Sequence, residues 1–149
     1  MSLQPVPIQN VPGVPDYTCT AFLPKSSDYC LLIPVINEGS RILTELGRAQ
    51  KAGVDRLVDI VICDGGSTDG SMNPDTLELY GVNTLLVKTG PGKQGAQLRM
   101  GLHFALTFGY KGVLTIDGNN KDSIEDVSEF VAKLKEGYDL VQGSRFIPG

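Results

Sequence analysis

The sequence has no apolar segment long enough to cross a membrane. None of its apolar runs approaches the roughly 20 residues that a spanning helix needs. The first residues also lack the basic start and the apolar stretch of a signal peptide. We therefore expect a chain with no membrane span and no leader, in a cytoplasmic location.

Positive charge is also scarce. The chain carries 13 Lys and Arg against 17 Asp and Glu, a net charge of −4, and its isoelectric point is about 4.9. This balance argues against nucleic acid or an anionic membrane surface as a partner. An acidic protein that binds a phosphate compound must do so locally, with backbone amides, a metal or a few placed cations.

Cysteine and histidine are few. Cys19, Cys30 and Cys63 are odd in number, and their spacing matches no zinc or redox pattern. Cys30 and Cys63 stand in apolar runs, so we expect buried, reduced thiols. The single histidine, His103, has no acid or cysteine at ligand spacing, and we expect it to pack or to lie at the surface rather than to catalyse.

The 149 residues fit one domain preceded by an arm. Residues 1–27 hold five prolines and little periodicity, so they are predicted to form a Pro-rich extended arm, partly disordered or laid across the domain. Residues 28–149 are expected to form the folded part.

Strands and helices alternate in the predicted fold. Short apolar runs predict strands at 29–35, 58–63, 84–87, 112–116 and 138–141. Apolar residues at helical spacing predict helices at 40–53, 74–80 and 95–108 (with Leu98, Leu102, Ala105 and Leu106 on one face) and at 124–134, where Ser123 and Asp126 form a capping-box pattern. Strands that are nearly all apolar are covered on both faces, so we predict an α/β fold with a mostly parallel sheet and helices on both faces.

Polar residues and glycines follow every predicted strand. In sheets of this kind ligands bind beyond the carboxyl ends of the strands. Turns need glycines, but they do not need carboxylates at several strand ends. The convergence of acids and glycines on one edge therefore predicts a ligand site there.

Five motifs follow the predicted strands in order: Asn37-Glu38 after an Ile-Pro strand, Asp64-Gly-Gly-Ser-Thr-Asp-Gly, Gly92-Lys-Gln-Gly, Ile116-Asp-Gly-Asn and Gly143-Ser-Arg-Phe. In this order they resemble family 2 glycosyltransferases. The resemblance runs from about Tyr29 to the last residue and is nearest to the polyprenyl-phosphate sugar transferases. It implies the GT-A fold, a Rossmann-like sheet that binds nucleoside-diphosphate sugars.

The resemblance also implies residue roles. Pro34, Asn37 and Glu38 would line the pocket for base and ribose, and Asp64 would accept a hydrogen bond from the uracil or guanine edge. Lys93 would lie at a rim near the phosphates. For Asp64 and Asn37 a purely local role, as turn or cap residues, stays open, and Ser67 to Asp69 are expected to form a turn that holds the loop.

The metal motif of the resembling family, Asp-x-Asp, stands here as Asp117-Gly118-Asn119. The resemblance implies Mg²⁺ or Mn²⁺ bound by Asp117 and Asn119 together with the diphosphate. Alternatively, Lys121 supplies part of the positive charge and the metal dependence is weak, or the site is inert. Arg145 is expected either to contact phosphate or to form a surface ion pair.

The implied activity is inverting transfer of a sugar from a UDP- or GDP-sugar to an acceptor of the polyprenyl phosphate class. The general base of the family would lie beyond residue 149, and family domains are longer, so we expect a chain truncated at its C-terminus. Such a chain would bind nucleotide and turn over poorly, and its full-length protein would work at the inner membrane face.

Three alternatives remain open at this point. Gly90-x-Gly92-x-x-Gly95 matches an NAD-type dinucleotide-binding fingerprint, although two strand–helix units precede it. A nucleotidyltransferase of similar topology would need a basic loop where this chain has Asn37-Glu38-Gly39. A non-catalytic nucleotide-binding or interaction module would tolerate the altered Asp-x-Asp motif.

Overall fold

The polypeptide is built around one sheet. A computed structural model describes residues 4–121, 123–136 and 140–142. Seven strands form the sheet in the order β1-β2-β5-β4-β3-β6-β7. The strands β3 (Tyr29–Val35), β4 (Asp59–Asp64), β5 (Val82–Lys88), β6 (Gly112–Thr115) and β7 (Leu140–Gln142) run parallel to one another. At one edge, β2 (Tyr17–Ala21) is antiparallel to both of its neighbours, β5 and β1 (Val6–Ile8).

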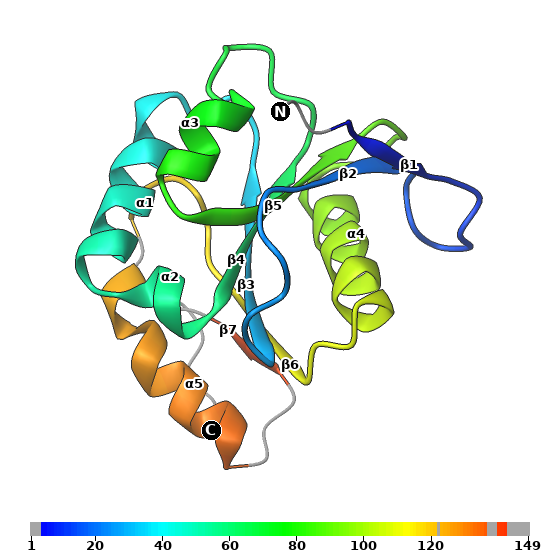
Figure 1. The fold of residues 1–149 in the computed structure, drawn as a ribbon. Coiled ribbons are helices and arrows are strands. Elements are labelled where there is room, and N and C mark those ends of the chain that lie inside the picture. The colour runs from blue at the N-terminus through cyan, green and yellow to red at the C-terminus, as the bar shows by residue number, and fades with distance from the viewer. Residues whose placement is uncertain (1–3, 122, 137–139, 143–149) are drawn as a thin grey trace.

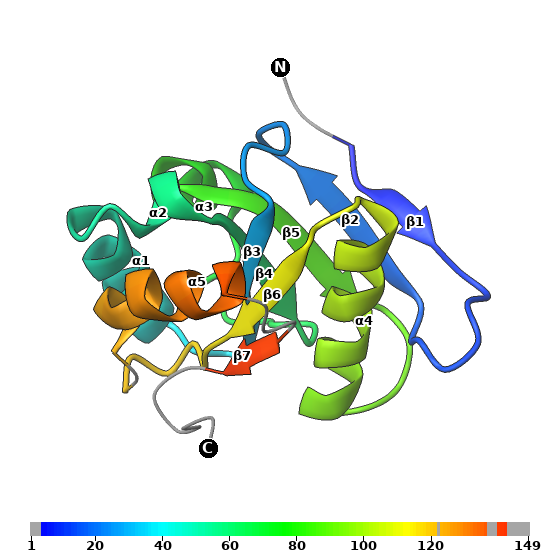
Figure 2. The same ribbon diagram turned by 90° about the horizontal axis from the view of Figure 1, so that it is seen from below.

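Helices cover both faces of the sheet, as predicted. On one face lie α1 (Ser40–Lys51), α2 (Val54–Leu57), α3 (Pro74–Leu79), the 3₁₀ turn η1 (Ile124–Asp126) and α5 (Val127–Lys135). On the other lies α4 (Gln94–Thr107), so that Figures 1 and 2 show α4 across the sheet from the other helices. The predicted α/β class with a mostly parallel sheet is confirmed.

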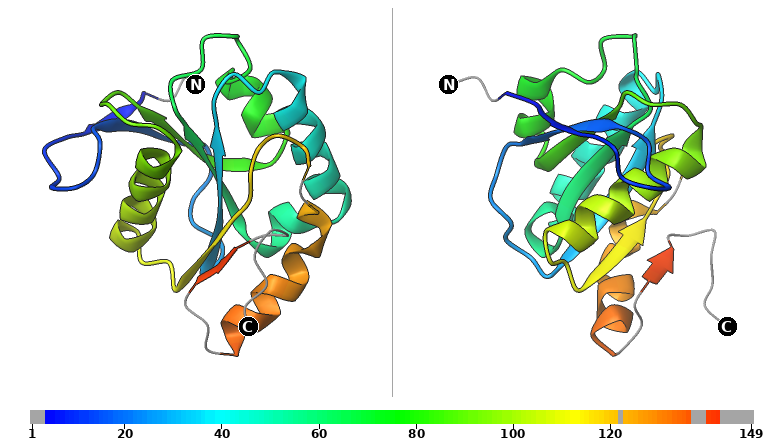
Figure 3. Two further views of the ribbon diagram at one scale, coloured as in Figure 1. Left: turned by 180° about the vertical axis from the view of Figure 1, so that it is seen from behind. Right: turned by 90° about the vertical axis from the view of Figure 1, so that its right-hand side faces the viewer.

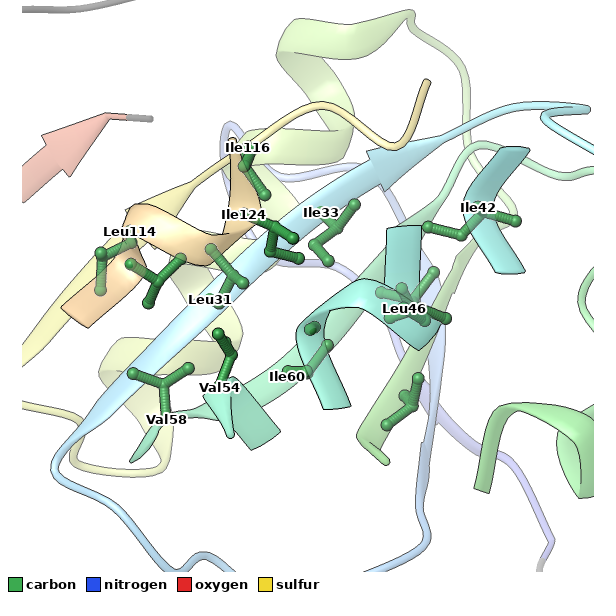
Figure 4. Close-up of a cluster of buried hydrophobic side chains, with 14 of the residues drawn as sticks. Leu31, Ile33, Ile42, Leu46, Val54, Val58, Ile60, Leu114, Ile116 and Ile124 are labelled. Atoms are coloured by element: carbon green, nitrogen blue, oxygen red, sulfur yellow. The ribbon is translucent and has the colours of Figure 1, made fainter. Parts of the chain in front are cut away.

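The larger core explains why the central strands are apolar throughout. Leu31, Ile33 and Ile60 point to α1 and its neighbours, and Ile42 and Leu46 of α1 meet them (Figure 4). Alternate residues of the same strands, such as Leu32 and Val61, join the second cluster under α4. Both faces of each central strand are therefore buried.

The buried face of α4 differs from the predicted one. Ala96, Met100 and Phe104 are buried, whereas Leu102 and Leu106 are 37% and 79% exposed. Gly101 allows the close approach, since an added Cβ there would lie 2.7 Å from Cys63 Sγ. Ala105, which belongs to the predicted spacing, is buried, so that spacing marked the buried face only in part, because apolar residues occur all round this helix.

The N-terminal segment adds two strands that the sequence did not predict. Within the expected arm, β1 (Val6–Ile8) and β2 (Tyr17–Ala21) pair antiparallel, and β2 pairs with β5. They extend the β5 edge on the side of α4 (Figure 3), where Tyr17 is 2% exposed. Pro7 is tolerated because β1 is an edge strand.

The predicted capping box before α5 is wrong. The Ser123 side chain makes no cap hydrogen bond, because η1 intervenes between Ser123 and the helix. A side-chain cap occurs instead at α3, where Asn73 Oδ1 accepts from the backbone N–H groups of Asp75 and Thr76.

The order of the parallel strands locates the site. Counted along the chain, the five parallel strands are arranged 3-2-1-4-5, so the order reverses between β3 and β6. Doubly wound sheets bind ligands in the crevice at this switch point, beyond the carboxyl ends of the strands.

Candidate functional site

A cavity of about 460 Å³ opens at the switch point between β3 and β6. Its wall comes from the ends of three strands and the start of α4. The lining residues are Pro34, Val35, Ile36, Glu38, Gly65, Gly92, Lys93, Gln94, Gln97, Asp117, Gly118 and Asn119. The structure thus brings five predicted site residues to one cavity, namely Pro34, Glu38, Lys93, Asp117 and Asn119.

Asn37 and Asp64 are two predicted site residues that do not line this cavity. Asn37 has φ +48° and accepts a hydrogen bond from the Thr68 backbone N–H at 2.8 Å. Asp64 is 2% exposed and accepts from both the backbone N–H and the hydroxyl of Ser67, the latter at 2.6 Å. Both side chains thus make the local contacts that the sequence left open, and their contact with a base stays a prediction.

The loop after β4 is tied to the loop after β3. Asn37 N–H donates to Ser67 Oγ, and Gly39 N–H donates to Asp69 Oδ2 at 3.0 Å. Hydrogen bonds from the side chain and backbone of Ser71 lower the pKa of the exposed Asp69 carboxyl, and the Gly39 bond adds to them. Ser67 and Asp69 thus hold the two loops together as one rim beside the cavity.

Glutamines at the start of α4 connect the helix to the site. Gln94 Nε2 donates to Asp117 Oδ1 at 2.9 Å. The buried Gln97 Nε2 donates to two carbonyls near the strand ends, Val35 O of β3 at 2.8 Å and Cys63 O of β4 at 2.9 Å. Gln97 was not among the predicted site residues, although an amide side chain on the same helix face as the apolar Ala96 and Met100 was a usable signal.

The loop after β6 is tightly packed at its start. An added Cβ at Gly118 would lie 2.5 Å from Val35 Cγ1, so the loop packs directly on the end of β3. Asn119 Oδ1 accepts from the Lys121 backbone N–H at 3.1 Å. Asp117 and Asn119 therefore stand at the cavity wall on a loop with defined geometry.

These donors fit a metal ion only together with a bound diphosphate. Among the described residues no three Asp, Glu, His or Cys side chains come together as a metal site. Mg²⁺ is commonly held by one or two protein oxygens while water and substrate phosphates complete its octahedron. Asp117 and Asn119 offer one carboxylate and one amide oxygen at the cavity wall, a donor set of that type.

Other candidate residues lie away from this arrangement or outside it. Lys121 is exposed and does not line the cavity. Arg145 lies outside the described residues. His103 Nδ1 is 2.7 Å from Tyr17 Oη on the far part of α4, in keeping with the predicted packing role.

The three thiols are buried and none is in a disulfide. Burial is the main cause that raises the pKa of the Cys30 thiol to about 12, and the Asp59 charge adds to it. Burial likewise raises the pKa of Cys63. These cysteines are structural rather than nucleophilic.

Comparisons with known proteins support a transferase. The chain is 31% identical over 124 residues to glycosyltransferase AglJ of Haloferax volcanii, a match that covers 83% of this chain and 38% of that protein. It is 30% identical over 122 residues to polyprenol monophosphomannose synthase of Mycolicibacterium smegmatis, covering 80% and 45%. No family model matches the chain. The predicted resemblance to glycosyltransferases is confirmed, and the chain spans less than half the length of these two relatives.

No helix in the described part of the chain is both long and apolar enough to cross a membrane.

Proposed function

We propose that this chain is the sugar-nucleotide-binding part of a glycosyltransferase of family 2. It would move a sugar from a UDP- or GDP-sugar to an acceptor with inversion at the anomeric carbon. One observation carries the proposal: the cavity at the switch point gathers Glu38, Lys93, Asp117 and Asn119, in a chain related to two glycosyltransferases.

The two ends of the donor would meet different parts of the site. The base and ribose would lie at the ends of β3 and β4. Pro34 and Glu38 would contact them, together with Asn37 and Asp64 beside the cavity. Asp64 accepts from Ser67 mainly through Oδ1, and because an ionised carboxylate has two acceptor oxygens, Oδ2 would be the atom that accepts from a ring N–H.

The diphosphate would lie toward α4 and the loop after β6. Lys93 offers positive charge at the start of α4, where backbone N–H groups also favour an anion. Asp117 and Asn119 would hold Mg²⁺ or Mn²⁺, which neutralises the charge of the leaving diphosphate when it is bound. Gln94, bonded to Asp117 Oδ1, would orient that carboxylate.

The acceptor we propose is a polyprenyl phosphate. The support is the name of the second relative, a polyprenol monophosphomannose synthase. A phosphate acceptor is already anionic and can attack without a general base, whereas a hydroxyl acceptor needs one. We further propose a cytoplasmic location, at the inner membrane face in the full-length protein, with which three unpaired buried thiols are compatible.

A non-catalytic nucleotide-binding module is the second candidate. The observation that favours it is the single carboxylate in the Asp117-Gly118-Asn119 motif, with no three-acid cluster among the described residues. Such a module would bind nucleotide with no metal effect.

Calorimetric titration with UDP and GDP, each with Mn²⁺ and with chelator, tests the proposal. Asp117→Ala removes the carboxylate at the cavity, and Asp75→Ala, on the exposed face of α3, is the matched control. We expect metal-dependent binding of one nucleotide that Asp117→Ala abolishes and Asp75→Ala leaves intact. Metal-independent binding would favour the module, and no binding of either nucleotide would contradict the proposal.

A further inference from the structure

Helix α1 buries a carboxylate that the proposed chemistry does not use. Glu45 is 0% exposed, on the same helix face as the core residues Ile42 and Leu46. Burying a carboxylate is costly unless it is hydrogen-bonded. Glu45 Oε1 accepts from the backbone N–H of Asn120 at 3.0 Å, in the loop that follows β6.

One turn further along α1, Arg48 also donates hydrogen bonds to this loop and to the turn that follows it. Its Nη1 donates to Asn120 Oδ1 at 2.5 Å. Its Nε and Nη2 donate to the two carboxylate oxygens of Glu125 at 2.7 and 2.8 Å. This forked geometry is the strong, directional form of an Arg–carboxylate pair.

The contacts fix the loop next to the residues that face the cavity. Asn120 adopts φ +63°, an uncommon conformation for a residue other than glycine, and it directly follows Asn119. Gly118 packs on Val35 at the start of the loop. The loop is thus held at its start by β3 and at its middle and end by Glu45 and Arg48.

We propose that Glu45 and Arg48 are positioning residues that aim Asp117 and Asn119 at the diphosphate of the bound donor. This inference rests on the proposed function and concerns the same cavity. Core packing by itself does not require this arrangement, because a buried ion pair replaced as a whole by apolar residues of similar volume is often neutral or stabilising. What an apolar residue at position 45 would lose is the anchor on Asn120.

The test compares two ligands that differ only in the diphosphate. Isotope-labelled protein is titrated with the better-binding nucleoside diphosphate and with its nucleoside, and the spectra report both affinities and the Asn120 amide. Glu45→Gln keeps an acceptor for the Asn120 N–H, Glu45→Leu removes it, and Arg48→Lys keeps the charge but loses the fork. Arg56→Lys, at an exposed position of α2, is the matched control.

We expect Glu45→Leu and Arg48→Lys to weaken diphosphate binding by about tenfold or more, the size of effect expected when a hydrogen bond to a charged group is lost. Nucleoside affinity should stay within about twofold, because nothing in its part of the pocket changes. Glu45→Gln and Arg56→Lys should behave like the wild type. The amide hydrogen of Asn120 should exchange with solvent faster than in the wild type in Glu45→Leu, but not in Glu45→Gln.

Two outcomes would overturn the inference, and ligand binding by the wild-type protein distinguishes them. If wild-type protein binds the diphosphate and the variants bind it equally well, only the positioning role fails. If wild-type protein binds neither ligand, the proposed function fails and the inference fails with it. Should Glu45→Leu not fold, Arg48→Lys decides the question by the same ratio of diphosphate to nucleoside affinity.

Discussion

At the scale of single residues, the two carboxylates that matter most to the candidate site already accept hydrogen bonds from neighbouring side chains. Asp64, the predicted base-recognition carboxylate, is held by Ser67, and Asp117 is bonded to Gln94. Local hydrogen bonds of this kind orient a carboxylate before a ligand arrives, so little is left to order on binding.

Gly118 is a position where one methyl group matters. We expect Gly118→Ala to lower the free energy of unfolding by about 1–3 kcal/mol, since its Cβ would meet Val35 Cγ1 at 2.5 Å. Urea unfolding measures the change. Gly95→Ala, whose nearest neighbour beyond the helix backbone is Arg99 Nη1 at 3.6 Å, is the control and should be tolerated. Equal stability of the two variants would contradict the close contact.

The Arg48–Glu125 pair predicts a dependence of stability on pH. The hydrogen bond from Arg48 is the main cause that lowers the pKa of Glu125 from its ordinary 4.5 to about 2. A lowered folded-state pKa stabilises the fold above the ordinary value, and this stabilisation is lost as pH falls through about 2. Because the Glu125 side chain is 45% exposed, we expect a contribution of at most about 1 kcal/mol.

Unfolding of wild type and Glu125→Gln, measured across this acidic range, checks the prediction. The stability difference between them should be largest near neutral pH and should vanish toward pH 2. A difference that stays constant with pH would show that the pair does not titrate as described.

At the scale of elements, α4 is attached to the sheet by both packing and polar contacts. Met100 and Phe104 belong to the second core cluster, and Gln97 donates to the carbonyls of Val35, the last residue of β3, and Cys63, the residue before the end of β4. The register of α4 sets where Lys93 and Gln94 stand, so Gln97 links the core to the site.

Substitutions of Gln97 should separate donor loss from repulsion. Gln97→Leu leaves two carbonyl groups without this donor and should cost about 1–3 kcal/mol of unfolding free energy. Gln97→Glu should cost more, because an ionised carboxylate can only accept and would face two carbonyl oxygens. Thermal unfolding of both variants gives the order, and a more stable Gln97→Glu at neutral pH would contradict it.

At the scale of the whole molecule, the N-terminal strands complete the second face. β2 pairs with β5, and its residues Tyr17 and Cys19 close the cluster that α4 covers. Without them β5 would be an exposed edge strand beside uncovered apolar surface.

Removal of residues 1–21 should therefore destabilise the fold and promote association. We expect a loss of about 3 kcal/mol or more, from the apolar surface of Tyr17 and its neighbours that becomes exposed. An unpaired β5 edge also offers a template for association. Thermal unfolding and light scattering measure the two effects, and Tyr17→Phe, which keeps the ring, is the milder control. An unchanged melting temperature after removal would contradict this role.

The sequence by itself determined the parallel core and the edge at which the candidate cavity opens. The run 29–35 is apolar throughout and is strand β3 over the same residues, because a strand buried on both faces leaves no room for polar alternation. The strand-end motifs located Pro34, Glu38, Lys93, Asp117 and Asn119 at one edge, since parallel strands bring their carboxyl ends together.

Only the tertiary structure decided what depends on contacts between distant segments. The N-terminal strands form because β5 and α4 offer them a partner, and the buried face of α4 follows from the close approach at Gly101. The same holds for the hydrogen bonds of the candidate site. Ser67 donates to Asp64, and Glu45 and Arg48 both bind Asn120, although no local periodicity in the sequence predicts these pairs. Such contacts depend on how the chain packs in three dimensions, and a local pattern along the sequence carries no record of that.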